Sequence, residues 1–126
     1  MTGALTPAVI ATVLGTGAAG AVGRYLLTRV LPVKHGKVPL AILLVNTVGS
    51  GLAGVVVGFE ERSVLSPDAR LILLTGLCGG LTTFSTWTVD TLRLIRERHY
   101  LPAAFNIAGT TVLAVGAATT GYLLAR

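Results

Sequence analysis

Charged side chains are scarce in this sequence of 126 residues. Asp, Glu, Lys and Arg together make up 12% of the chain, whereas a typical soluble domain carries about a quarter. So few charges argue against an ordinary soluble domain. The single cysteine, Cys78, cannot form a disulfide within the chain, and we expect it to be a small packing residue. His35 has no second histidine or carboxylate near it at a ligand spacing, so we expect it to be solvated.

Long uncharged stretches take the place of the missing charges. Hydrophobic residues make up 52% of the chain, and four stretches contain no Asp, Glu, Lys or Arg. Each has roughly the 20 residues that a helix needs to cross a bilayer. We therefore expect an all-α integral membrane protein with one domain, 1–126, and four transmembrane helices. Their approximate ranges are 5–30, 38–59, 68–94 and 100–125.

The net charge of +5 is not the footprint of a nucleic-acid binder, because the basic residues are scattered among the connectors between apolar spans. Six basic residues flank the first and third connectors and three lie on the other side, so we expect the first and third connectors to face the cytoplasm. The six are Arg29, Lys34, Lys37, Arg93, Arg96 and Arg98, and the three are Arg62, Arg70 and Arg126.

A polar run, residues 79–87, interrupts the third apolar stretch. Gly79 and Gly80 weaken a helix just before several hydroxyl and aromatic side chains. Polar residues inside a membrane are costly and usually mark a path for a substrate or an ion. Unwound backbone at that depth is tolerated only where protein buries it or a cavity adjoins it. We therefore expect the third helix to be broken near Gly79, with a binding site at the break.

The run Gly79-Gly80-Leu81-Thr82-Thr83-Phe84-Ser85-Thr86 closely resembles the signature of the small fluoride channels called Fluc or CrcB. Residues 23–25 (Gly-Arg-Tyr) and 45–50 (Val-Asn-Thr-Val-Gly-Ser) are similar too, so the resemblance covers nearly the whole chain. It implies a passive fluoride channel, an antiparallel dual-topology homodimer in the lipid bilayer of the plasma membrane. It also implies a structural sodium ion, Na⁺, at the dimer interface, held by the backbone carbonyls of Gly79 and Thr82.

The resemblance assigns pore roles to Asn46 and to the aromatic pair Phe84 and Trp87, although the family has phenylalanine where Trp87 stands. Ring edges are positive and can stabilise an anion. Plain packing of the rings, and an interhelical hydrogen bond from Asn46 that joins subunits, stay open as alternatives. Arg24 either extends to the headgroups or charges an anion vestibule. The donor path is expected to include Thr83, Ser85, Asn106 and Thr110 as well.

In the first span, Gly15, Ala19 and Gly23 recur every four residues, which predicts close approach of another helix. On the fourth span, Thr110 and Thr111 have an alternative role, since membrane threonines often bond a preceding carbonyl of their own helix.

No enzyme constellation is present, so we expect a protein that is not an enzyme. A small dual-topology coupled transporter is the main alternative to a channel, and a non-conducting assembly is a third. No acidic residue lies in any of the four uncharged stretches, and Asp90 is expected where the third helix ends in a mixed, mostly basic connector at the membrane interface. Proton-coupled export requires a membrane-embedded carboxylate, so this inventory favours an anion channel.

Overall fold

The computed structural model describes residues 5–126, and all the regular structure in this part of the chain is helical. The described part of the chain forms four candidate membrane spans, here called crossings. Three of them are single continuous helices: α1 (Pro7–Val30), α2 (Leu40–Glu61) and α6 (Tyr100–Ala125). The remaining crossing is composite. It consists of α3 (Pro67–Leu71), the π-helix η1 (Ile72–Cys78), α4 (Gly79–Leu81) and α5 (Phe84–Arg96). All four crossings are long and apolar enough to span a membrane, which confirms the predicted all-α class with four spans.

Local signals explain where the helices begin. Thr6 precedes α1 and its side chain accepts a hydrogen bond from the Val9 N–H at 3.2 Å, with Pro7 in the first helical position. Ser66 caps α3 in the same way, accepting from the Ala69 N–H at 3.2 Å. A hydroxyl at this position satisfies one of the N–H groups that a helix leaves without a partner at its start.

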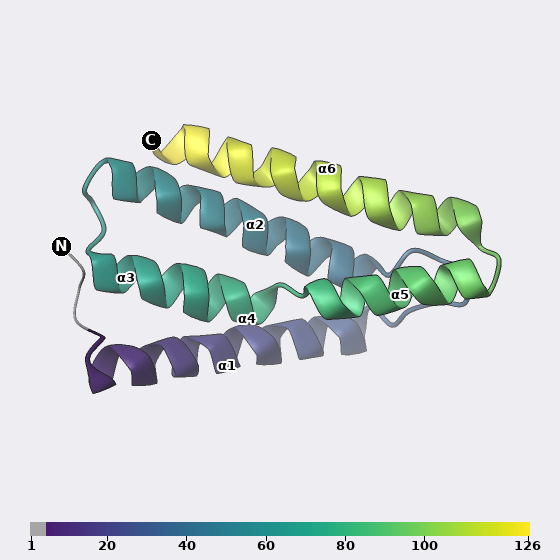
Figure 1. Cartoon of the computed structure of the whole chain (residues 1–126), viewed down its shortest axis with the longest axis horizontal. Helices are drawn as coiled ribbons and strands as arrows, with labels where there is room; N and C mark the ends of the chain where they lie inside the picture. The colour runs from purple at the N-terminus through teal and green to yellow at the C-terminus, as the bar shows by residue number, and fades with distance from the viewer. Residues whose placement is uncertain (1–4) are drawn as a thin grey trace.

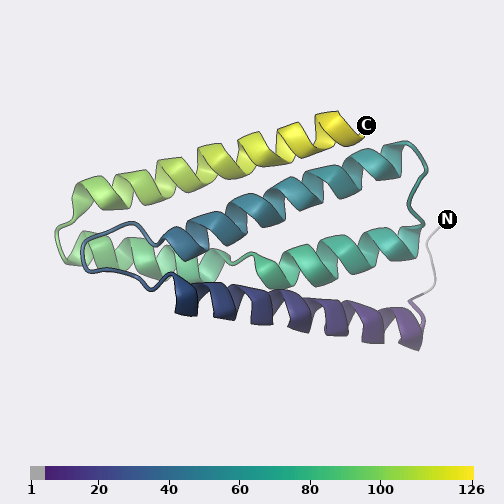
Figure 2. The same cartoon turned by 180° about the vertical axis from the view of Figure 1, so that it is seen from behind.

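The helices lie side by side along the long axis of the molecule (Figure 1). The view from behind shows the same order, with α6 next to α2 and α3 to α4 next to α1 (Figure 2). The α2–α6 contact is the most extensive, and η1 and α4 pack on α1. Past the junction between α4 and α5, the third crossing leaves α1 and packs on α6 instead. The junction therefore determines which helices surround each half of this crossing.

The backbone is extended at Thr82 and Thr83, with φ/ψ of −80/159 and −151/122. The sequence places the interruption near Gly79, but Gly79 is helical, with φ −63 and ψ −38. The glycines have a packing role instead. A Cβ on Gly80 would collide with the backbone of Gly17 on α1, its carbonyl carbon lying only 2.8 Å away. Glycine is needed here for the close approach of two helices, and the helix ends three residues later than expected.

The face of α1 that packs within the chain is not the predicted stripe of small residues. Gly15, Ala19 and Gly23 are exposed in the single chain, and a Cβ on Gly15 would meet nothing within 4 Å. The contact with the third crossing is made by Gly17 and Gly20. A Cβ on Gly20 would lie 2.6 Å from the Leu77 carbonyl oxygen. Within one chain the close contact therefore uses Gly17 and Gly20, while the predicted stripe of Gly15, Ala19 and Gly23 lies on a face that the single chain leaves open.

This difference gives a matched pair of substitutions on one helix. Gly20→Ala should destabilise the fold by about 1–3 kcal/mol, because the added methyl group overpacks the α1–α4 contact. Gly15→Ala fills open space and should gain about 0.5–1 kcal/mol from its better helix propensity. Thermal unfolding of the detergent-solubilised variants measures both effects. Equal melting temperatures for the two variants would contradict this packing of α1.

Candidate functional site

The interruption at Thr82 and Thr83 releases main-chain groups that an unbroken helix would pair internally. Asn46 on α2 satisfies two of them: its Oδ1 accepts from the Thr83 N–H at 2.8 Å and its Nδ2 donates to the Thr83 carbonyl at 3.1 Å. In a continuous helix the Thr83 N–H would donate to Gly79, so the Gly79 carbonyl is released from the helix. Asn46 therefore joins two helices within one chain.

Arg24 on α1 holds the other side of the interruption. Its Nη1 donates to the Thr82 carbonyl oxygen at 2.9 Å. Arg24 is half-buried, and its guanidinium group reaches from α1 to the backbone of the third crossing. A fixed positive charge therefore lies directly at the break. This contact does not test the vestibule role, which stays a prediction for Arg24.

Hydroxyl groups cap the start of α5. The Thr83 Oγ1 accepts from the Thr86 N–H at 3.2 Å and lies 3.1 Å from the Thr86 Oγ1. The Ser85 Oγ lies 3.3 Å from the Thr83 Oγ1, and Ser85 is exposed in the single chain. This cap is the physical reason that a helix restarts at Phe84 after only two extended residues.

A groove of about 370 Å³ opens beside the interruption, between α2, α5 and α6. The Phe84 side chain stands at the groove with 76% of its surface exposed, and its ring centroid is 5.4 Å from that of Trp87. The structure brings six of the residues predicted for the pore or for sodium into this one groove. They are Asn46, Thr82, Thr83, Phe84, Trp87 and Thr110.

Thr110 contributes a buried hydroxyl to this groove. It is 5% exposed, and its Oγ1 has no hydrogen-bond partner among residues 5–126. The next residue behaves differently, because the Thr111 Oγ1 donates to the Ile107 carbonyl at 2.8 Å. The alternative of a threonine bonded to its own helix therefore holds for Thr111 and not for Thr110. A buried hydroxyl without a partner costs stability, so it marks a place where a ligand or a water is expected.

Asn106 lies outside the groove and is completely buried, with 0% exposed surface. Its Nδ2 donates to the Thr91 Oγ1 at 2.9 Å, and that hydroxyl donates to the Trp87 carbonyl at 2.8 Å. The orientation of the amide follows, because a hydroxyl that already donates can only accept from Asn106. The Trp87 indole N–H is also used, since it donates to the Asn106 carbonyl at 3.1 Å. In this arrangement, neither of these donors faces the groove.

Four further groove residues were not predicted as pore residues. They are Ser50, Thr111, Ala114 and Val115, and Ser50 shares the four-residue stripe of α2 with Asn46. That stripe was the signal that could have identified Ser50. Thr91 was not recognised either, because a lone threonine next to Asp90 carries no signal until its bonds to Trp87 and Asn106 are known.

Asp90 is buried in a helix and does not lie in the interfacial connector where it was expected. It lies inside α5, is 6% exposed, and its Oδ2 has no hydrogen-bond partner in the described part of the chain. Its Oδ1 lies 3.6 Å from the Arg93 guanidinium, one helical turn away. Residues three apart are neighbours on a helix surface, so the opposite charges of Asp90 and Arg93 support the last turns of α5. The helix therefore continues past the end of the uncharged stretch. The argument that no span contains an acid therefore fails.

Comparison with known proteins identifies the family. The family model described as "CrcB-like protein, Camphor Resistance (CrcB)" matches residues 11–122. A protein of Pyrococcus furiosus named "Fluoride-specific ion channel FluC" is 43% identical over 118 residues, covering 93% of this chain and 95% of that protein. Proteins with the same name from Thermococcus onnurineus and Nitrobacter winogradskyi are 39% and 40% identical, and each comparison covers 93% of this chain and 94% of the relative. A family model over most of the chain and relatives matched nearly end to end agree, and the chain belongs to the CrcB-like protein family.

Proposed function

We propose that the protein is a fluoride-selective passive channel that releases fluoride from the cell. The observation that carries this proposal is the Thr110 hydroxyl, which has no partner among residues 5–126 and lies in the groove beside the Asn46 amide. The names of the relatives supply the ion, and the groove supplies uncharged donors that suit a small anion. The chain's non-enzyme character follows from the same family.

Fluoride is small and strongly hydrated, so a pore must replace its water with closely spaced donors. The Asn46 amide has two N–H groups and uses one of them on the Thr83 carbonyl. The second N–H and the Thr110 hydroxyl are then donors for the ion. The exposed ring of Phe84 adds a positive edge. Such neutral donors hold an anion weakly enough for it to leave again.

The working unit is an antiparallel homodimer in the plasma membrane. A single chain leaves the exposed Ser85 and Thr86 hydroxyls and the open groove on the outside of its third crossing. Polar groups at this depth would be costly against lipid, whereas a second copy or a water-filled pore can cover them. Two copies in opposite orientation would also place a groove on each side of the interface.

A sodium ion would be held at the interface by the carbonyls of Gly79 and Thr82. The Gly79 carbonyl fits, because the Thr83 N–H that would bond it donates to Asn46 instead. The Thr82 carbonyl already accepts from Arg24, which leaves its second lone pair for an ion. Two carbonyls are fewer ligands than a hard cation takes, so the second copy must provide the rest. Sodium would supply positive charge that holds carbonyl groups of both copies together.

A flux measurement tests the function. Liposomes containing the purified protein should release fluoride rapidly when a potassium ionophore sets the voltage, and a fluoride electrode follows the release. Release of chloride, measured with a chloride electrode, should be far slower, because a larger ion fits closely spaced donors poorly. The Asn46→Asp variant supplies the baseline, since a carboxylate cannot donate to the Thr83 carbonyl and repels anions. Equal rates for both anions would refute the proposed selectivity.

A neighbouring pair of threonines tests the role of the groove. Thr110→Val should slow fluoride release at least about tenfold, because a hydrogen bond to a charged group is worth about 1.5–3 kcal/mol. Its fold should be as stable as wild type or more so, since the change removes a buried hydroxyl without a partner. Thr111→Val is the matched control. Thr111 also lines the groove, but its hydroxyl hydrogen is donated to the Ile107 carbonyl and is not available to an anion, so this variant should conduct normally. Similar losses in both variants would place the ion path elsewhere.

Asp90 distinguishes a passive channel from a proton-coupled transporter. Asp90→Asn keeps the shape of the buried side chain and removes its charge. We expect fluoride release at neutral pH to persist in this variant, within about threefold of wild type, and to need no proton gradient in either protein. Release that requires a gradient in wild type and loses that requirement in Asp90→Asn would favour coupled transport. Parallel thermal unfolding separates a folding defect from either result.

A further inference from the structure

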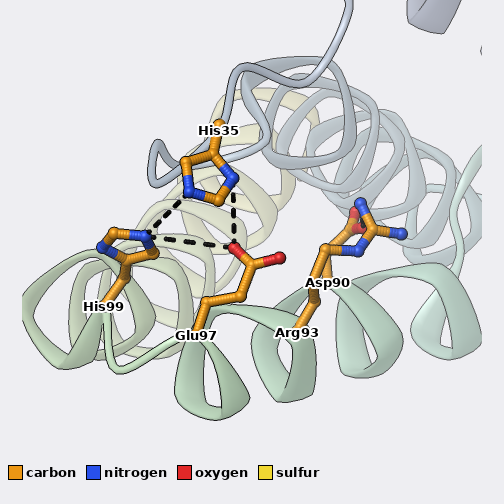
Figure 3. A network of polar contacts seen from close by, with 5 residues as sticks. All are labelled: His35, Asp90, Arg93, Glu97 and His99. Atoms are coloured by element: carbon orange, nitrogen blue, oxygen red, sulfur yellow. Dashed lines mark hydrogen bonds and ion pairs between the residues drawn. The ribbon is translucent and has the colours of Figure 1, made fainter.

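Three side chains that can bind a metal meet at the end of the molecule where the connector between α1 and α2 passes the turn between α5 and α6 (Figure 3). His35 lies in the connector, Glu97 directly follows α5 and His99 directly precedes α6. Each offers one ligand atom, and the three atoms lie within 4.8 Å of one another. The His35 side chain is 79% exposed, which agrees with the prediction that it is solvated. It nevertheless has partners, which were not expected because they lie more than sixty positions further along the chain.

The distances suit a small divalent ion. The Nε2 atoms of His35 and His99 are 3.4 Å apart. The Glu97 Oε2 is 3.5 Å from the His35 Nδ1 and 4.0 Å from the His99 Nε2. Ligand bonds of about 2.0–2.2 Å to a tetrahedral zinc ion place ligand atoms roughly 3.3–3.6 Å apart. The contacts at 3.4 Å and 3.5 Å use different nitrogens of the His35 ring, so one ion can take only one of them. Rotation of the His35 and Glu97 side chains would bring the three ligand atoms, which lie within 4.8 Å of one another, to these separations.

The backbone holds the three ligands in place. Gly36 has φ +66, and a Cβ there would lie 3.0 Å from the His99 ring, so glycine lets the connector cross directly over this imidazole. On the other side, α5 ends in a turn with Arg98 at φ +61 and a hydrogen bond from the His99 N–H to the Leu94 carbonyl at 2.8 Å. This is a common helix-ending motif, and it fixes the spacing of Glu97 and His99.

We propose that His35, Glu97 and His99 bind a divalent transition-metal ion of the zinc class, with water as a fourth ligand. Two imidazoles and one carboxylate are a known zinc ligand set, and imidazole disfavours the hard ions Ca²⁺ and Mg²⁺. Lys34 and Lys37 line a cavity of about 240 Å³ that also includes His35 and Glu97. Their positive charges oppose any cation held by charge alone. The His35 side chain is 79% exposed, which gives an ion access from water.

Binding of an ion would link the connector between α1 and α2 to the turn between α5 and α6. The bound ion ties the connector, residues 31–39, to the α5–α6 turn and so fixes the ends of α1 and α2 relative to α5. The site lies apart from the groove beside the interruption, which shares none of these residues. Metal binding here does not depend on fluoride conduction and is measured without fluoride.

The test uses purified protein in detergent, free of any histidine tag, with competition against a chromophoric zinc chelator. We expect one Zn²⁺ per chain, and tetrahedral Co²⁺ absorption when cobalt replaces zinc. His99→Gln should weaken Zn²⁺ binding at least about tenfold, since even the loss of an outer partner costs about 10–100-fold. The double variant His35→Gln/His99→Gln should not bind. The controls Cys78→Ala and Asp68→Asn should bind as wild type does, because their side chains lie outside the cluster.

A second variant tests the geometry without removing a ligand. Gly36→Ala keeps all three ligands but pushes the connector away from the His99 ring, so Zn²⁺ binding should weaken. Alanine is also strained at a φ of +66, so thermal stability without metal should fall, and thermal unfolding of the metal-free variant measures that separate effect. Hydrogen exchange of residues 31–39 should slow when Zn²⁺ is added to wild type. The proposal is overturned if wild type binds no Zn²⁺, if Mg²⁺ binds equally well, or if the double histidine variant binds as wild type does.

Discussion

The structure depends on satisfying the main-chain groups released where the third crossing is interrupted. Within a membrane no water can replace a lost helical hydrogen bond, so an extended pair of residues needs partners from the protein. Asn46 pairs with both the N–H and the carbonyl of Thr83, and Arg24 binds the Thr82 carbonyl. One partner comes from α2 and the other from α1. The interruption is thus fixed from two sides, and α1 and α2 are positioned by the same contacts.

This arrangement also creates the groove. Before the interruption the third crossing packs on α1 through glycines that allow backbone contact, and after it α5 packs on α6. The change of neighbour leaves an opening between α2, α5 and α6 at the level of Thr83. The Trp87 indole N–H donates to the Asn106 carbonyl, and the Asn106 side-chain amide donates to the Thr91 hydroxyl on α5. These two bonds hold α5 against α6. They act as the support of the groove, while Asn46, Phe84 and Thr110 line it.

The four-span organisation could be predicted because uncharged stretches of membrane length are a property of the sequence alone. The region of the interruption was also predictable, since hydroxyls and glycines in an apolar stretch are conspicuous. Its position was not, because whether Gly79 ends a helix depends on contacts with α1 that spacing does not reveal. For the same reason the contact of Gly17 and Gly20 with the third crossing, the burial of Asp90 and the meeting of His35 with His99 required the fold. Each depends on residues far apart in the chain.

The two hydrogen bonds between Asn46 and Thr83 would prepare this side chain for the anion contact proposed for it. An amide left free would have to give up rotational freedom to bind an ion, and that entropy would weaken binding. Because the Oδ1 and one N–H of Asn46 are already fixed by Thr83, the remaining N–H has a defined direction before any ion arrives. Neutral donors held in this way stabilise an anion with little reorganisation. A charged donor in the same place would bind the anion more tightly and slow its exit, which is why an amide suits a conducting site better than a lysine would.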